Sequence, residues 1–257
     1  MIVPRGLRAF TLLELVLVML VVAILVSGLA VPFASQMALR RQADTLRLLD
    51  ESREALIGFA IANGRLPCPA TATSHGLESF EPGADALSGR CADFHEGFLP
   101  GATLGLSPLD AQGFVRDGWG GEANRIRYAV FGAGRDVAGI ANPLTRANGM
   151  QRATLAELGA APSYLLVCAS GEGLTSASCG AATNHLTRKA AFVLLSLGPN
   201  AAAIPRRGTD ESRNVDGDGV FVSREASSAP SNEFDDLLTW VPVHLLASRL
   251  VAAGRLP

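Results

Sequence analysis

Residues 214–225 carry oxygen-bearing side chains at the spacing of a calcium-binding loop. The first, third, fifth and twelfth positions of such a loop are filled by Asn214, Asp216, Asp218 and Glu225. Glycine stands at the sixth position, and Ca²⁺ prefers clusters of oxygen ligands of this kind. A bound ion would order the loop, and further ligands could come from Asp210, Asp235 or Asp236. Because Asn and Asp beside Gly also form ordinary turns, the alternative is a plain turn into a strand over residues 219–223.

The four cysteines form an even set, Cys68, Cys91, Cys168 and Cys179. There is no CxxC pair and no histidine placed to complete a zinc site, so disulfides are favoured over four buried thiols. If this part of the chain lies outside the cytoplasm, Cys68–Cys91 and Cys168–Cys179 is the simplest of the three connectivities. Each of these pairs closes a short loop at modest entropic cost.

Signatures of the common enzyme classes are missing from the sequence. It contains no GxSxG, HExxH or GxxxxGK[ST] motif, and residues 132–136 lack the third glycine of a dinucleotide-binding loop. Surface or packing roles are expected for the four scattered histidines, His75, His95, His185 and His244. The sequence therefore predicts a protein that is not an enzyme. Nucleic acid is not an expected partner either, because the net charge is −2 and the basic residues are scattered.

A long N-terminal helix and several short strands are expected to position these groups. Residues 36–62 are amphipathic at helical spacing, and Asn63 and Gly64 provide a C-terminal cap. Strands are predicted over residues 125–131, 163–169, 190–197 and 219–223. A short helix is predicted over residues 154–158, and a final helix, kinked or split at Pro242, over residues 235–253.

The N-terminal region has the composition of a membrane-spanning segment. Arg5 and Arg8 precede an apolar run over residues 15–34 that contains no charged side chain. A helix of this length reaches about 30 Å, the thickness of a hydrocarbon core, and preceding arginines favour a cytoplasmic N-terminus. The sequence thus predicts a single-pass membrane protein whose C-terminal part faces outward.

Glu14 separates three interpretations of this region, a cleaved secretory signal, a plain signal anchor and a prepilin leader. A carboxylate in an apolar helix costs several kcal/mol to bury unless it meets a positive partner, and a secretory signal has no use for one. The segment RAFTLLELVLVMLVVAILVSGLA resembles the N-terminal signal of type IV prepilins and type II secretion pseudopilins. The resemblance implies that a prepilin peptidase cuts between Ala9 and Phe10 and methylates Phe10, with Ala9 where glycine is usual. It also implies that Glu14 pairs with the N-terminal amine of a neighbouring subunit.

Two further segments resemble the pseudopilin side of this family. Residues 117–120 with 127–130 look like its Asp-x-Trp-Gly turn and strand, and residues 196–200 with 234–240 look like its C-terminal strand and calcium loop. The resemblance implies an α+β pilin-like fold, a long membrane-spanning helix packed on a mainly antiparallel sheet. The resemblance implies a leader at residues 1–9 and a transmembrane and filament-core half-helix at residues 10–34. An amphipathic extracytoplasmic half-helix at residues 35–63 and a disulfide-containing head at residues 64–257 would follow.

The resemblance also implies the function. The chain is expected to be a structural subunit of a type IV pilus or a type II secretion pseudopilus. Its large head favours a minor, less abundant subunit over the major one. Its expected partners are the prepilin peptidase, other pilin or pseudopilin subunits and the bacterial inner membrane, with the C-terminal domain in the periplasm. The alternative is an anchored extracytoplasmic enzyme or binding protein that uses a pilin-type N-terminal segment.

Overall fold

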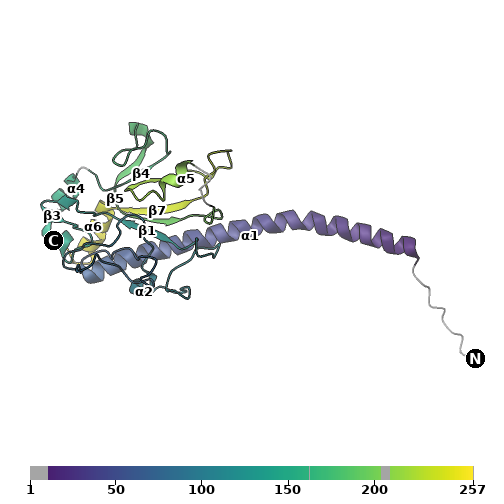
Figure 1. Cartoon of the computed structure of the whole chain (residues 1–257), viewed down its shortest axis with the longest axis horizontal. Coiled ribbons are helices and arrows are strands. Elements are labelled where there is room, and N and C mark those ends of the chain that lie inside the picture. Colours follow the sequence, from purple (N-terminus) through teal and green to yellow (C-terminus); the bar gives the residue numbers. More distant parts are fainter. Residues whose placement is uncertain (1–10, 162, 204–208, 257) are drawn as a thin grey trace, which may run out of the picture. The chain divides into compact units, whose positions relative to one another are not determined.

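The computed structural model describes residues 11–161, 163–203 and 209–256, with the backbone alone at residues 26–34 and 155. The chain divides into two compact units, Met1–Ala43 and Asp44–Pro257. Its elements, drawn in Figure 1, form a mixed α/β structure in which one long helix precedes all the strands. We call residues 44–257 the C-terminal unit.

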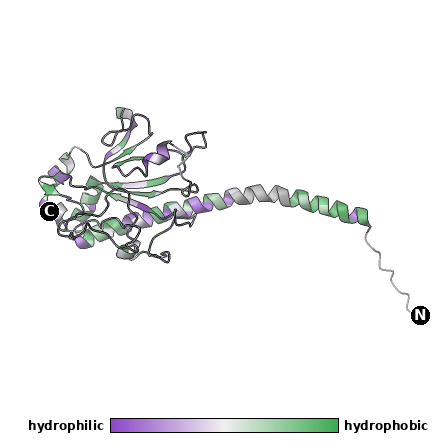
Figure 2. Cartoon of the chain, viewed as in Figure 1, coloured by the Kyte–Doolittle hydropathy of each residue, from purple (hydrophilic) through white to green (hydrophobic). Residues whose placement is uncertain are grey.

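The long helix α1 (Leu12–Asn63) confirms the predicted amphipathic segment at residues 36–62. Its buried face is formed by residues three or four apart, Thr45, Leu49, Ser52, Leu56 and Ala60. Gly64 ends the helix in a left-handed conformation with φ +68°, and its N–H donates to the Ala60 carbonyl at 2.8 Å. At the other end of α1, the described apolar residues before position 26 are exposed. Figure 2 shows that this end of the helix is hydrophobic.

The predicted membrane span at residues 10–34 is wrong. Within the part of the chain that the structure describes, no helix contains an apolar stretch long enough to cross a membrane. The same finding corrects the predicted single-pass inner-membrane location with a cytoplasmic N-terminus and a periplasmic domain. It also corrects the predicted pilin-like α+β class, which was defined by a membrane-spanning helix.

Strand β5 (His185–Ser196) is the centre of a five-stranded sheet. It pairs antiparallel with β1 (Arg127–Val130), β4 (Leu165–Cys168) and β7 (Leu237–Pro242), and β4 pairs parallel with β6 (Val220–Val222). The strands β1, β4, β5 and β6 confirm the four predicted strand regions. All of β4 and the last seven residues of β5 are buried. Leu165 and Val167 of β4 and residues 190–194 of β5 share one apolar core with the buried apolar residues of α1.

The C-terminal region differs from the helix predicted over residues 235–253, which was expected to be kinked or split at Pro242. Residues 237–242 form β7 along β5, and only Val243–Ala252 form a helix, α6. Pro242 lies at the boundary: it is the last residue of β7 and the N-cap of α6. Proline lacks the N–H that a helix interior needs, which is why the helix begins after it rather than continuing through it.

Short elements complete the described fold, and both predicted disulfides are present. The predicted short helix is α4 (Leu155–Ala160), which begins with a capping box between Thr154 and Glu157. The others are α2 (Gly101–Leu104), β2 (Asp136–Val137), β3 (Ile140–Ala141), α3 (Gly149–Arg152), η1 (Ala182–Asn184) and α5 (Thr209–Arg213). Cys68–Cys91 and Cys168–Cys179 are bonded, which confirms the local pairing.

Candidate functional site

Asn214, the first residue of the predicted calcium loop, uses its side chain to extend the sheet. It is buried, its Oδ1 accepts from the Val222 N–H at 2.7 Å, and its Nδ2 donates to the Val222 carbonyl at 3.1 Å. The same Nδ2 donates to Asp236 Oδ2 at 2.8 Å. The amide therefore satisfies the backbone of β6, much as a neighbouring strand would, and joins β6 to the segment before β7.

The remaining residues of that loop form a turn. Asp216 Oδ1 accepts from the Asp218 N–H at 3.2 Å, Asp218 Oδ1 accepts from the Val220 N–H at 2.8 Å, and Glu225 is exposed. Among the described residues, the carboxylates of this loop are not part of a convergent group of three possible metal ligands. The geometry is that of the alternative interpretation, a turn that leads into β6, and calcium at this loop stays a prediction.

Asp218 is the residue of this turn whose carboxyl pKa is clearly shifted from its ordinary value. Partial burial raises the pKa of its carboxyl from 3.8 to about 6, and the negative charge of Asp216 acts in the same direction. The hydrogen bond from the Val220 N–H opposes this shift. The turn therefore holds a carboxylate whose negative charge is disfavoured in the folded chain.

Three other carboxylates do converge in the C-terminal unit, those of Glu211, Asp235 and Asp236. One oxygen atom from each lies within 4.8 Å of the others. Glu211, on α5, is fully buried, and Asp236 is 4% exposed. We call these three residues the acidic cluster. Oxygen ligands in such an arrangement suit a hard cation such as Ca²⁺.

Neighbouring polar groups fix the carboxylates of the acidic cluster in place. Asn200 Nδ2 donates to both oxygens of Glu211 at 3.1 Å, and the Asp235 N–H donates to Glu211 Oε1 at 2.8 Å. Gly198, with φ +65°, lies against the same group. A Cβ atom at residue 198 would be 2.3 Å from Asp235 Oδ1 and 2.6 Å from its carbonyl oxygen, so only glycine fits there.

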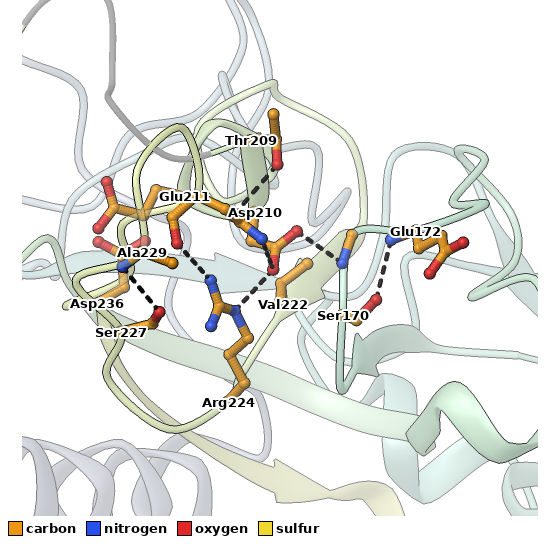
Figure 3. Close-up of polar contacts among 12 residues, drawn as sticks. Ser170, Glu172, Thr209, Asp210, Glu211, Val222, Arg224, Ser227, Ala229 and Asp236 are labelled. Atoms are coloured by element: carbon orange, nitrogen blue, oxygen red, sulfur yellow. Dashed lines mark hydrogen bonds and ion pairs between the residues drawn. The ribbon is translucent and has the colours of Figure 1, made fainter.

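Asp210, the neighbour of Glu211 on α5, has a different set of partners. Its carboxylate forms a 2.7 Å ion pair with Arg224, as Figure 3 shows. It also accepts from the Gly171 N–H at 2.9 Å. The Arg224 guanidinium also lies over the Phe234 ring, 4.7 Å from its centroid. Two adjacent buried acids thus serve separate structures, and Asp210 is not part of the acidic cluster.

Sequence reasoning identified part of the acidic cluster. Asp235 and Asp236 were expected as additional ligands of the 214–225 loop, whereas Glu211 was missed. Glu211 belongs to a five-residue helix with no motif spacing, so no signal in the sequence connects it with residues 24 positions later. Only the tertiary fold brings α5 and the start of β7 together.

At the N-terminal end, the predicted processing residues Ala9 and Phe10 lie outside the described residues. Glu14 lies in the first turn of α1, where its N–H donates to Thr11 Oγ1 at 3.3 Å. All described side chains from residue 12 to residue 25 are exposed, and Glu14 is the one charged residue among them. This stretch, the N-terminal apolar segment, is an uncovered apolar helix surface with a single acid at its start.

Scans against protein-family models, curated proteins and solved structures found no match for this chain.

Proposed function

We propose that this protein is a structural subunit of a filament of the type IV pilus or type II secretion pseudopilus kind, assembled through α1. The observation that carries the proposal is the N-terminal apolar segment, residues 12–25, whose described side chains are all exposed. Leu12, Leu13 and Ile24 expose 81%, 79% and 62% of their surface. Burying one such side chain gains about 1.5–3 kcal/mol, so copies of this helix stabilise one another by packing together.

Glu14 supplies the specificity of this packing. A carboxylate buried between apolar helices requires a positive partner. Under the proposal, cleavage between Ala9 and Phe10 creates that partner, the N-terminal amine of an adjacent subunit. The resemblance of the segment to prepilin N-termini supports this pairing, and the absence of enzyme motifs is consistent with a structural role. The size of the C-terminal unit favours a minor subunit over the bulk one.

Replacing Glu14 tests the proposal. In cells that produce the full chain, Glu14→Ala should lower the amount of assembled filament by at least about 100-fold, since breaking a buried charge pair costs about 3–5 kcal/mol. The matched control is Glu51→Ala, which removes an exposed glutamate of the same helix that pairs with Arg47 at 2.7 Å. Normal assembly of Glu14→Ala, at wild-type protein levels, would overturn the proposal.

Two further measurements test the contact itself. Leu17→Cys should form disulfide-linked dimers in assembled filaments under mild oxidation, whereas Leu87→Cys should not, although both leucines are exposed in the chain. Mass analysis of the mature N-terminus should find methylated Phe10. A mature chain that begins elsewhere, together with unlinked Leu17→Cys, would instead support a secreted binding protein or enzyme.

A further inference from the structure

Asp117 is a buried carboxylate that gathers hydrogen bonds from three segments of the C-terminal unit. Its Oδ1 accepts from the N–H groups of Trp119 and Gly120 at 2.9 and 3.3 Å, which closes the turn that it begins. Its Oδ2 accepts from Ser196 Oγ at 2.6 Å and from Asn124 Nδ2 at 3.1 Å. All four donors are neutral, and the residue is 6% exposed, so its charge is held by hydrogen bonds in a water-poor site.

On one side, the Asp117 turn contacts the long helix. The N–H of Gly118 donates to Thr45 Oγ1 at 3.0 Å. Thr45 lies on the buried face of α1 and has no exposed surface. This contact is a directional polar link between the turn and α1 in a face that is otherwise mainly apolar.

On the other side, the turn contacts the chain that leads to the acidic cluster. Asn124 Nδ2, which donates to Asp117, also donates to the Gly198 carbonyl at 2.7 Å, and the Gly198 N–H donates to Ser196 Oγ at 3.3 Å. Gly198 is packed directly against Asp235, with no room for a Cβ atom between them. Asp235 in turn donates its N–H to Glu211.

We propose that Asp117 is a positioning residue that couples α1 to the acidic cluster. A displacement of Glu211 or Asp235 shifts Gly198, alters the two side chains that hold Asp117 Oδ2, and weakens the contact between Gly118 and Thr45. Each link is a buried or partly buried hydrogen bond, or a contact at Gly198 without room for a Cβ atom, so a shift of one segment is passed to the next. The coupling is argued from these contacts alone. Its consequence for assembly, that the acidic cluster sets how firmly α1 is held by the C-terminal unit, rests on the proposed function.

Hydrogen exchange of the Gly118 amide tests the coupling in the purified full chain. Glu211→Gln should increase exchange at Gly118 by about 10-fold, within the range of coupling energies for residues of one hydrogen-bond network. Asp210→Asn is the matched control because it removes the adjacent buried acid, whose partners are Gly171, Arg224 and Asn232, all outside the acidic cluster. The Asp210→Asn variant should leave the hydrogen exchange rate of the Gly118 amide unchanged. Equal effects of the two variants, or none from Glu211→Gln, would overturn the coupling.

Variants of Asp117 separate positioning from simple stabilisation. The carbonyl oxygen of Asp117→Asn can still accept from Trp119 and Gly120, whereas its NH₂ group faces the NH₂ group of Asn124. In Asp117→Asn, hydrogen exchange should therefore rise at the Asp235 amide while the Trp119 amide stays protected. In Asp117→Ala, both amides should lose protection. Uniform loss of protection in Asp117→Asn would show a structural role only. Because no filament is needed for these measurements, they can fail or succeed independently of the assembly experiments.

Discussion

The N-terminal apolar segment and the C-terminal unit differ in where their apolar side chains lie. In residues 12–25 the described apolar side chains are all exposed. In the C-terminal unit, leucines of the same helix, such as Leu49 and Leu56, lie in the core, and polar groups such as Asp117 and Asn214 are hydrogen bonded internally. One helix thus contains a part stabilised within the chain and a part whose apolar surface is left for other contacts.

This difference separates stability from assembly. A substitution in the C-terminal unit should change the free energy of unfolding of the isolated protein, because its contacts are made within the chain. A substitution in residues 12–25 should leave that free energy nearly unchanged and act on association with other copies. Variants that violate this division would show that the two regions are not distinct in the way the structure indicates.

The largest effect is expected from truncating a buried leucine of α1. Leu56 has no exposed surface, and Leu56→Ala should lower the free energy of unfolding by about 2–5 kcal/mol, the cost of lost burial and of the cavity left behind. Leu17→Ala makes the same chemical change at a side chain that is 61% exposed, and it should change stability by less than about 0.5 kcal/mol. Urea unfolding of both variants measures the difference. Similar losses would mean that Leu17 is covered in the isolated chain.

A smaller effect within the C-terminal unit depends on pH. Burial raises the pKa of the Asp218 carboxyl to about 6, above its ordinary value of 3.8, so folding favours the protonated form. Its contribution to stability is fully present below about pH 4 and is lost as the pH rises through about 6. Asp218→Asn, which is always neutral, should therefore be more stable than the wild type at pH 8. We expect about 1 kcal/mol after allowance for solvent screening, and no difference near pH 4.

Thermal or urea unfolding of both proteins across pH 4–8 measures this difference. Glu225→Gln is the control, because Glu225 is an exposed acid a few residues away and accepts none of the hydrogen bonds of the turn. The interpretation of Asp218 fails if Asp218→Asn is less stable than the wild type at pH 8, or if its advantage does not change with pH.

How much of this could be predicted from the sequence depends on whether the signal is local. The helical spacing of residues 36–62 predicted an amphipathic helix, and short loop closure predicted both disulfides, because these features depend on neighbouring residues. The composition of residues 15–34 predicted a membrane span, a conclusion that the described structure does not support.

The features that the sequence did not predict depend on tertiary pairing. Leu237 and Leu238 fit a helical pattern as well as a strand pattern. The segment nevertheless pairs with β5, since a strand there completes the sheet. Glu211 joins the acidic cluster through α5, and Asn214 takes the place of a neighbouring strand beside β6. In each case the deciding partner lies far away in the sequence.

The smallest expected effect is stabilisation of the C-terminal unit by calcium. If the acidic cluster binds Ca²⁺ with a Kd of about 1 mM, as extracellular modules do, then 2 mM Ca²⁺ stabilises the folded state by about 0.6 kcal/mol. Glu211→Gln removes one carboxylate of the cluster and should abolish the shift, whereas Asp210→Asn, with the same change of charge on the same helix, should retain it. Thermal unfolding with Ca²⁺ or Mg²⁺ at matched ionic strength measures the shift, and an equal response to both ions would indicate screening of surface charge. A Ca²⁺ response that is lost instead in Asp216→Asn would assign the ion to the 214–225 loop.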